Sequence, residues 1–424
     1  MMSSGTLKNL ALFVLCVAGS ILSGCIAPPV TVPNVVDMTQ AAAQAALTSA
    51  GLTLGTVTEE YSASIPDGNV VSQTPAAGAS AARGTAVALA LSQGEDPAGV
   101  TVSVPAGTFV MGNSGVGDDA VSPGADESPL HAVTLGAYQI GKYDVTNQEY
   151  CEVLNWALAQ GYLKDAAGAP WAGAGDLYAG GVLQEILVFT DPECNIGFAG
   201  GVFSPKKRVG LPGTTIYPTD THPVVDVSWY GAAAFCSWLN QMEGLTICYD
   251  MTTANWPLTV APPSPGGYRL PTEAEWERAA AWDGSKHWIY GFTADTLGTA
   301  ADRCNDVFVN PLGLTGIPFT SPVGWFDGVN VSPNGGVTTV NSVSPTGCYD
   351  MSGNVWQWVQ DWYSASYYGG GPMTNPVGPA PVLYRVYRGG SWDTGSKICR
   401  SAFRDYSTPT DTSSDLGFRL AKSN

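Results

Sequence analysis

Histidine and serine, which often carry acid–base or nucleophilic catalysis, occur here without the spacing that such chemistry needs. The three histidines, His131, His222 and His287, lie far apart in the sequence, and none belongs to an HxxH or HxxxH pair. Ser391 and Ser401 have no nearby histidine to act as a general base, so the sequence gives no support for a serine triad. We therefore interpret each histidine as a structural side chain.

The cysteines also lack a catalytic spacing. Seven of the nine follow residue 100, and they contain no CxxC pair, which argues against a thioredoxin-like motif and a zinc ribbon. An odd number cannot all pair within one chain, so we expect buried thiols with one or two disulfides. The seven are Cys151, Cys194, Cys236, Cys248, Cys304, Cys348 and Cys399.

Another cysteine, Cys25, closes an apolar segment near the start of the chain. Lys8 is the only charged side chain before the apolar run at 10–22. That run is shorter than the roughly 20 residues of a membrane-spanning helix and has the length of a signal-peptide core. It ends in the letters LSGC, which resemble a bacterial lipobox. The resemblance implies a lipoprotein signal peptide at 1–24, cleavage before Cys25, and lipid on the Cys25 sulfur and amino group.

The expected location follows from that segment. Residues 25–31 would be the lipidated tether, and no later segment is apolar enough to span a membrane. We expect a bacterial cell-envelope protein that is anchored in the membrane by an N-terminal lipid and faces the periplasm or the cell exterior. The alternative is an ordinary signal peptide followed by a chance cysteine.

Composition excludes two classes of protein. The 424 residues carry a formal net charge of −18 and no cluster of Lys or Arg, which argues against a nucleic-acid partner. The chain contains 13 Trp, 18 Tyr and 12 Phe, and such an aromatic content needs a core or a binding surface, so disorder is excluded. Residues 32–94 contain no Trp, Cys or His, which marks a separate domain before a linker at 95–100.

The first domain, 32–94, reads as one helix and three strands. Thr39 can cap an Ala-rich helix that Gly51 would end, and alternating stretches follow at 53–58, 70–73 and 85–91. The VPNVV opening and the VxxQxPAxG turn resemble a PASTA domain, which implies a small helix packed on a three-stranded sheet. Some members of that family bind cell-wall muropeptides and others act as spacers. A single copy favours a spacer or a weak contact with cell-wall material.

The second domain, 101–424, has three predicted helix starts among short strands and long loops. Thr146 and Glu149 form a capping box, Ser228 caps a second helix, and Thr272 with Glu275 forms another capping box. Capping explains both glutamates without catalysis. Residues 101–112 alternate like a strand of a hairpin. A few capped helices with much irregular structure indicate an α+β fold.

Six motifs of this domain occur in a recognisable order. They are PAGTF (105–109), HPVVDVSW (222–229), YRLPTEAEWE (268–277), YDMSGNVWQW (349–358), RGGSW (388–392) and GFRL (417–420). Together they resemble the sulfatase-modifying-factor domain of the formylglycine-generating enzyme family. The resemblance implies that residues 101–424 form a loop-rich variant of the C-type lectin fold.

The chemistry of that family depends on two cysteines that this chain lacks at the matching positions. Catalytic members oxidise a cysteine of a sulfatase peptide with copper held by two thiolates shortly after the GGS motif, and soft thiolates suit Cu(I). Here Thr394 occupies the first position, the segment of the second is shortened, and Cys399 matches a core cysteine. We therefore expect neither copper nor formylglycine formation, although whether the protein is an enzyme stays open.

A calcium site is implied by the same resemblance. The matching positions are the Asp350 side chain, the Gly353 and Val355 carbonyls and the side chain of Gln357, and such oxygen ligands suit Ca²⁺. Gln357 stands where the family usually has Glu, so one negative charge is lost and the site should be weaker. The alternative is a metal-free turn.

The C-terminal loops offer residues for recognition. Aromatic and small polar side chains mixed on loops are typical of adaptable binding surfaces. The alternative is that Trp392 and Phe403 belong to the core, and we expect Arg388, Arg400, Arg404 and Arg419 to bind loop carbonyls and carboxylates. The segment also resembles the variable region of retroelement-diversified lectin-fold proteins. The candidate ligand-binding residues are Trp392, Asp393, Thr394, Phe403, Asp405 and Tyr406.

Two functions are compatible with the sequence. We predict an envelope-anchored surface recognition module that binds an unidentified glycan or protein. The alternative is an oxidoreductase of the formylglycine-generating or non-haem metal enzyme family, acting on a protein or a small molecule through a site that the sequence does not locate.

Overall fold

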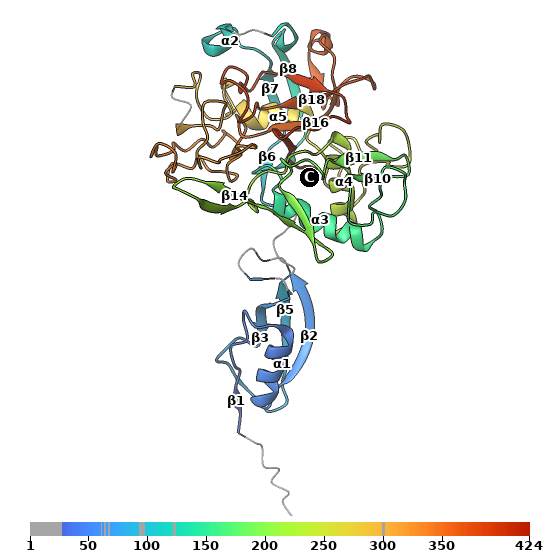
Figure 1. Cartoon of the computed structure of the whole chain (residues 1–424), viewed down its shortest axis with the longest axis vertical. Helices are drawn as coiled ribbons and strands as arrows, with labels where there is room; N and C mark the ends of the chain where they lie inside the picture. Colours follow the sequence, from blue (N-terminus) through green and yellow to red (C-terminus); the bar gives the residue numbers. More distant parts are fainter. Residues whose placement is uncertain are drawn as a thin grey trace, which may run out of the picture. The chain divides into compact units, whose positions relative to one another are not determined.

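The computed structural model describes residues 28–60, 62, 65–66, 68–92, 98–121, 124–298 and 302–424. Cys25 and the predicted signal peptide lie outside these residues. The chain divides into two compact units, Met1–Glu95 and Asp96–Asn424, which are drawn in Figure 1. None of the helices in the described ranges is long and apolar enough to cross a membrane.

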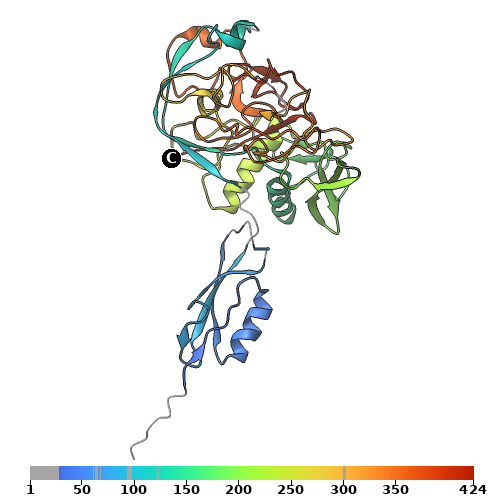
Figure 2. The ribbon, with the colours of Figure 1, turned by 90° about the vertical axis from the view of Figure 1, so that its left-hand side faces the viewer.

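The first unit is one helix on a three-stranded sheet, as predicted. The Thr39 hydroxyl accepts a hydrogen bond from the Ala42 N–H and caps the helix, and Gly51 follows the helix with a φ of +78°. The helix lies against the sheet in Figure 2, and Leu47 and Val87 are fully buried between them. The sheet has the order β2-β5-β3, and β1 pairs with β4. The elements are α1 (Gln40–Ser49), β1 (Val30–Thr31), β2 (Thr53–Glu60), β3 (Val70–Thr74), β4 (Ser80–Ala81) and β5 (Ala86–Ser92).

The second unit is built on one four-stranded and two three-stranded sheets. Their orders are β19-β18-β16-β20, β17-β8-β7 and β21-β9-β6. Within the first of these, β16 pairs antiparallel with β18 and parallel with β20. The strands are β6 (Thr101–Val104), β7 (Gly107–Met111), β8 (His131–Leu135), β9 (Tyr138–Gly141), β16 (Trp356–Trp362), β17 (Met373–Thr374), β18 (Arg385–Arg388), β19 (Asp405–Ser407), β20 (Leu416–Phe418) and β21 (Ala421–Ser423).

The expected hairpin strand at 101–112 is wrong in detail. The segment forms two strands, and β6 pairs with β9 while β7 pairs with β8. Pro105 lies between them, and because proline has no N–H to donate, the ladder is interrupted there.

Three two-stranded hairpins complete the strands of the second unit. They are β10 (Leu177–Ala179) with β11 (Gln184–Leu187), β12 (Ile196–Ala199) with β13 (Val202–Pro205), and β14 (Lys207–Gly210) with β15 (Thr215–Pro218).

The three longer helices begin at the predicted caps. Both capping boxes form, at Thr146 and at Thr272, and the Ser228 hydroxyl accepts from the Gly231 N–H. The helices of this unit are α2 (Gly117–Val121), α3 (Asn147–Ala159), α4 (Trp229–Met242) and α5 (Glu273–Ala281), with 3-10 turns η1 (Ala125–Glu127) and η3 (Tyr367–Gly370). With few helices, many short strands and long loops, the molecule has the predicted α+β class.

The expected disulfides are absent from the described residues. All seven described cysteines are buried free thiols. Cys151, Cys194, Cys236 and Cys248 belong to the large apolar cluster that packs around α3 and α4, so they act there as small apolar side chains. Burial raises the pKa of each of these four thiols.

Candidate functional site

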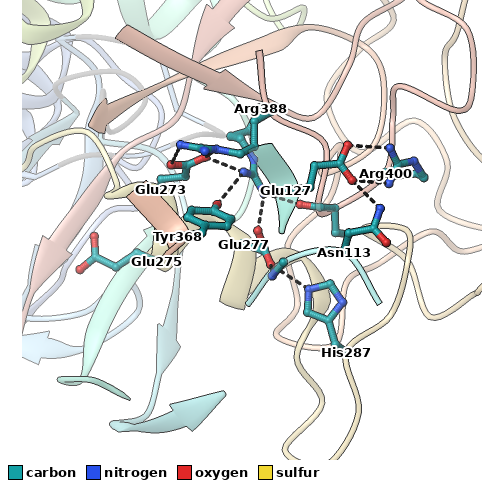
Figure 3. A network of polar contacts seen from close by, with 12 residues as sticks. Asn113, Glu127, Glu273, Glu275, Glu277, His287, Tyr368, Arg388 and Arg400 are labelled. Carbon is teal, nitrogen blue, oxygen red and sulfur yellow. Dashed lines mark hydrogen bonds and ion pairs between the residues drawn. The ribbon is translucent and has the colours of Figure 1, made fainter. Parts of the chain in front are cut away.

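Buried ion pairs hold the segment that contains the predicted ligand-binding residues. Arg388, at the end of β18, donates to Glu273 at 2.6 Å and to Glu277 at 2.5 Å, both on α5 (Figure 3). Arg404 donates to both carboxylate oxygens of Glu273, at 2.6 and 2.8 Å. As predicted, these arginines bind carboxylates and carbonyls. They fix both ends of the loop between residues 388 and 404 to one helix.

A third arginine of this loop is tied to a different part of the chain. Arg400 donates to Asp119 at 2.6 Å and to Glu127 at 2.8 Å, and its side chain is fully buried. Glu127 also accepts from the Asn113 side chain at 2.7 Å, and Figure 3 shows both partners around its carboxylate. The loop is therefore clamped between α5 and the η1 turn.

Glu277 is the most crowded carboxylate of the network. It accepts hydrogen bonds from the Gly112 N–H at 2.7 Å and from His287 Nε2 at 3.0 Å, in addition to Arg388. Burial alone would raise its pKa, but the Arg388 charge and the His287 hydrogen bond hold the pKa at about 2. Glu277 is therefore ionised at all physiological pH values and serves to position the loop.

Thr394, which the sequence predicts at the position of the first copper thiolate, has a structural hydroxyl. Thr394 Oγ1 accepts from the Ser391 N–H at 2.8 Å and lies 3.9 Å from Cys399 Sγ. Cys399 is fully buried, and burial, with a further contribution from the Asp306 charge, raises its pKa to about 12. Since the thiolate is the nucleophile, a metal-free thiol with this pKa is poorly suited to nucleophilic chemistry at neutral pH.

A second thiol lies within electrostatic range of Cys399. Cys304 is 2% exposed, and burial, followed by the Cys399 charge, raises its pKa well above the usual value. Among the described residues no group of three or more His, Cys, Asp and Glu side chains could hold a metal ion. A centre built on Cys399 and position 394 would have one thiolate and one hydroxyl, which does not fit a two-thiolate copper site.

The predicted ligand-binding residues divide into buried and exposed side chains. Trp392 is 5% exposed and packs on Phe319, with its Nε1–H donated to the Ser414 carbonyl at 3.1 Å. Phe403 is half-buried against the core, with its ring centroid 6.1 Å from that of Trp356. Both side chains therefore support the loop, whereas Asp393 is exposed on its surface.

Tyr406 lies on β19 in an aromatic group. It is 39% exposed and stacks on Tyr363 with ring centroids 3.7 Å apart, and Tyr384 lies 5.1 Å away. The neighbouring Asp405 carboxylate accepts from the Tyr406 N–H at 2.8 Å. Sequence reasoning missed Tyr363, which follows β16, and Tyr384, which precedes β18. Both come beside Tyr406 because β16 and β19 each pair with β18.

A second residue missed from the sequence is an exposed phenylalanine beside the loop. The Phe308 side chain is 82% exposed, and the preceding Val307 N–H donates to the Thr394 carbonyl at 3.1 Å. Phe308 lies outside the six motifs, so its sequence position gave no signal. Val307 is also 45% exposed, so the two residues form a small exposed apolar patch beside the loop.

Carboxylates gather on the other side of Trp392. Asp415 accepts from the Ser391 hydroxyl at 2.6 Å, and the Asp226 N–H donates to the Ser413 carbonyl. Asp226 is 3% exposed, and its Oδ2 has no partner among the described residues. Burial, followed by the charges of Asp191 and Glu193, raises its pKa to about 7. This part of the site is strongly acidic.

The predicted calcium loop is closed by Gln357. Its Oε1 accepts from Trp276 Nε1 at 2.5 Å and from Arg419 Nε at 2.6 Å, while its Nε2 donates to the Asp350 carbonyl at 2.7 Å. The Trp and Arg groups can only donate, so the amide orientation is fixed and both Oε1 lone pairs are used. Gln357 therefore does not fit the role of a calcium ligand.

The remaining predicted ligands are less constrained. The Asp350 carboxylate accepts from the Gly324 N–H at 2.6 Å, and burial raises its pKa to about 6. It lines a cavity of about 10 Å³ together with Arg303, which is the size of one water molecule. Calcium binding through Asp350, Gly353 and Val355 stays a prediction.

The histidines have structural contacts. The Nδ1 atoms of His131 and His222 lie 3.0 Å from the Pro129 carbonyl and the Thr320 hydroxyl, and His287 pairs with Glu277. Burial lowers the pKa of His222 to about 3, so it is neutral at physiological pH.

Comparison with known proteins places both units. A family model described as "Sulfatase-modifying factor enzyme 1-like domain" matches residues 88–424, and a PASTA domain model matches residues 30–93. The chain is 30% identical over 331 residues to a formylglycine-generating enzyme of Thermomonospora curvata, covering 76% of this chain and 92% of that protein. It is 28% identical over 352 residues to the inactive C-alpha-formylglycine-generating enzyme 2 of Mus musculus, covering 79% and 89%.

Solved structures resemble the chain in the same region. Treponema denticola variable protein 1 aligns with a TM-score of 0.49 and 23% identity, covering 76% of this chain and 95% of that one.

Removing one carboxylate from the α5 network should cost much of the stability of the second unit. Glu273→Gln keeps the size but leaves Arg388 and Arg404 with one buried carboxylate fewer, which costs about 3–5 kcal/mol. The melting temperature of the second unit should fall by at least about 6 °C. The matched control is Asp295→Asn, which breaks the half-exposed pair with Lys286 and should cost less than about 1 kcal/mol. Equal melting temperatures for the two variants would contradict the assigned role of the network.

Asp226→Asn should stabilise the protein in a pH-dependent way. The folded-state pKa of Asp226 is about 7, above the unfolded value of about 3.9, so its contribution to stability falls as pH rises between these values. At about pH 8 the variant should melt at a higher temperature than the wild type, and its free energy of unfolding should be higher by at most roughly 4 kcal/mol. This difference should shrink toward pH 4. Thermal melts across this range measure the gap, and a pH-independent gap would refute the raised pKa.

Gln357→Glu should create or strengthen a calcium response. The new carboxylate would face the Asp350 carbonyl where an amide N–H is now donated, and two acceptors need a cation between them. Calcium at a hundredfold excess over its Kd would then stabilise the variant by about 2.7 kcal/mol. Melting with calcium and with chelator measures the effect in both proteins. The same response in wild type and variant would show that position 357 has no part in calcium binding.

Proposed function

We propose that this chain, which belongs to the sulfatase-modifying factor family through residues 88–424, is a recognition protein that does not form formylglycine. The relatives of this chain include both formylglycine-generating enzymes and a protein named as inactive. Family membership alone therefore does not decide whether this chain forms formylglycine.

The chemistry around Thr394 is the observation on which the proposal rests. The hydroxyl at this position is used in a backbone hydrogen bond to Ser391, and the adjacent Cys399 thiol is buried with a pKa of about 12. Copper oxidation of a cysteine needs two thiolates, and position 394, beside Cys399, offers a hydroxyl in place of the second one. The loop nevertheless keeps the buried ion pairs that would hold it in shape.

The exposed residues of the same region would form the binding surface. Phe308 supplies an apolar anchor beside Thr394, Asp393 supplies a charge, and Tyr406 with Asp405 supplies an aromatic and polar edge on β19. Trp392 and Phe403 pack against the interior of the unit and support this surface. A rigid scaffold that presents aromatic and polar loop residues suits a glycan or protein ligand.

The first unit supports a location outside the cytoplasm. Its match to the PASTA family favours an extracytoplasmic position and contact with cell-wall material, with the unit acting as a spacer or a weak wall binder. Lipid attachment at Cys25 would anchor the chain in the membrane by its N-terminus. The binding unit would then be held at the envelope.

The purified chain should leave a cysteine-containing sulfatase peptide unchanged in the presence of copper. The same chain should bind a member of an array of envelope glycans and secreted proteins. Phe308→Ala and Asp393→Asn should each weaken that binding by about tenfold, the effect expected of an anchor residue. Mass spectrometry of the peptide and titration of the array hit measure the two results.

Two controls make the outcome decisive. The Thermomonospora curvata enzyme should convert the same peptide under the same conditions. Ile216→Ala, at a 62% exposed position on β15, should leave binding unchanged. Conversion of the peptide by this chain, with loss of the activity in Cys399→Ser, would overturn the proposal.

A further inference from the structure

Among the described arginines that are less than 2% exposed, one has no carboxylate partner. Four of the five arginines that are less than 2% exposed contact a carboxylate within 2.9 Å: Arg269, Arg388, Arg400 and Arg419. The fifth, Arg385 at the start of β18, contacts no carboxylate among the described residues. An ionised group without a counter-ion is costly to bury, so its surroundings need an explanation.

Two tryptophans cover the flat faces of this guanidinium. The Arg385 Cζ atom lies 3.6 Å from the ring centroid of Trp229 and 3.6 Å from that of Trp362. Such stacking stabilises a cation but provides no hydrogen bonds. With both faces covered, a further partner can reach the guanidinium only at its edge.

The edge of the guanidinium is incompletely bonded. Nη1 donates to the Gln360 carbonyl, and Nη2 has a long contact of 3.4 Å with the Asn255 carbonyl. Nε has no partner among the described residues. The Nε atom is shielded from solvent, but each Nη group carries two N–H donors and has only one contact within the described ranges, so an Nη N–H is left for a ligand in the pocket.

Arg385 lines a pocket with apolar walls and one further donor. The pocket has a volume of about 220 Å³, and Leu258, Trp362 and Val377 contribute to its walls. Gln360 also lines it, and its Oε1 accepts from the Tyr249 hydroxyl at 2.8 Å. Its Nε2 donates to none of the described residues, so a second N–H donor lies at the pocket with Arg385.

The rim of the pocket has an unusual backbone. Asn255 and Trp256 both have positive φ, at +61° and +40°. A bulky aromatic residue rarely adopts this conformation, and such strain clusters at ligand sites. Trp256 is fully buried and donates Nε1–H to the Val182 carbonyl, so the surrounding structure holds the strained segment in place.

We propose that the Arg385 pocket binds the carboxylate of a small apolar acid, such as the C-terminal end of a peptide. A planar carboxylate can meet the free edge of the guanidinium in its own plane between the two indoles, and the Gln360 amide supplies a second donor. The apolar walls receive the substituent next to the carboxylate. The ligand thereby provides a carboxylate in direct contact with Arg385, whereas Asp361 of the protein acts on it only through space.

This pocket is independent of the recognition surface proposed above. Phe308, Asp393 and Tyr406 are not among the residues that line the pocket. Phe308→Ala should therefore leave carboxylate binding unchanged, so the failure of one proposal does not decide the other.

Titration calorimetry of the full chain with N-acetyl-leucine tests the pocket. Saturable binding is expected with a Kd of about 1 mM or lower, and N-acetyl-leucine amide, which lacks the charge, should bind at least about tenfold more weakly. Inorganic phosphate serves as the tetrahedral anion for comparison. Absence of acid binding, equal binding of acid and amide, or binding of phosphate alone would each overturn the carboxylate assignment.

Steric variants locate the binding without changing Arg385. Ala261→Phe and Ala254→Phe fill the pocket from exposed wall positions, and each should abolish acid binding. Ala199→Phe, at an exposed position on β12 outside this pocket, is the matched control and should bind the acid like the wild type. Acid binding that survives both pocket variants would place the ligand elsewhere and refute the proposal.

Discussion

The shape of the second unit depends on arginines neutralised inside it by carboxylates. Burying a guanidinium is favourable only when a counter-ion and good hydrogen-bond geometry come with it, so each pair fixes two distant segments at a defined distance. Glu273 and Glu277 on α5 thereby determine where β18 ends and where the loop after it returns. Arg400 joins that loop to residues nearly 300 positions earlier through Asp119 and Glu127. With so little regular secondary structure, these pairs replace the backbone ladders that usually hold a loop.

Such a scaffold can keep its form while its chemistry changes. Thr394, at the position where the sequence comparison expects a thiolate, accepts a hydrogen bond from the Ser391 N–H. Gln357, at the position where the sequence comparison expects a carboxylate, forms hydrogen bonds with Trp276, Arg419 and the Asp350 carbonyl. In both places a neutral group completes its hydrogen bonds locally. The loops around them then remain available to present side chains to a ligand.

The sequence predicted those features that depend on neighbouring residues. The caps at Thr39, Thr146 and Thr272 appear where the spacing placed them, because a capping bond spans three residues. The partners of Arg388 and Arg400 could not be read in this way, because they lie more than 100 positions away and are chosen by tertiary packing. The same holds for Phe308, for the raised pKa of Asp226 and for the unpaired Arg385. The prediction of disulfides was wrong: the seven described cysteines are free thiols, and four of them pack as apolar side chains in the core around α3 and α4.

Titration of the full chain with Cu(I) tests most directly whether the thiolate chemistry has been lost. Copper–thiolate bonds absorb in the near ultraviolet, and Cys399→Ser removes the thiol beside Thr394. Because Cys399 is fully buried and has the Thr394 hydroxyl beside it in place of a second thiolate, the account predicts no copper–thiolate absorption that distinguishes wild type from Cys399→Ser at neutral pH. A stoichiometric copper–thiolate band that disappears in Cys399→Ser would contradict it.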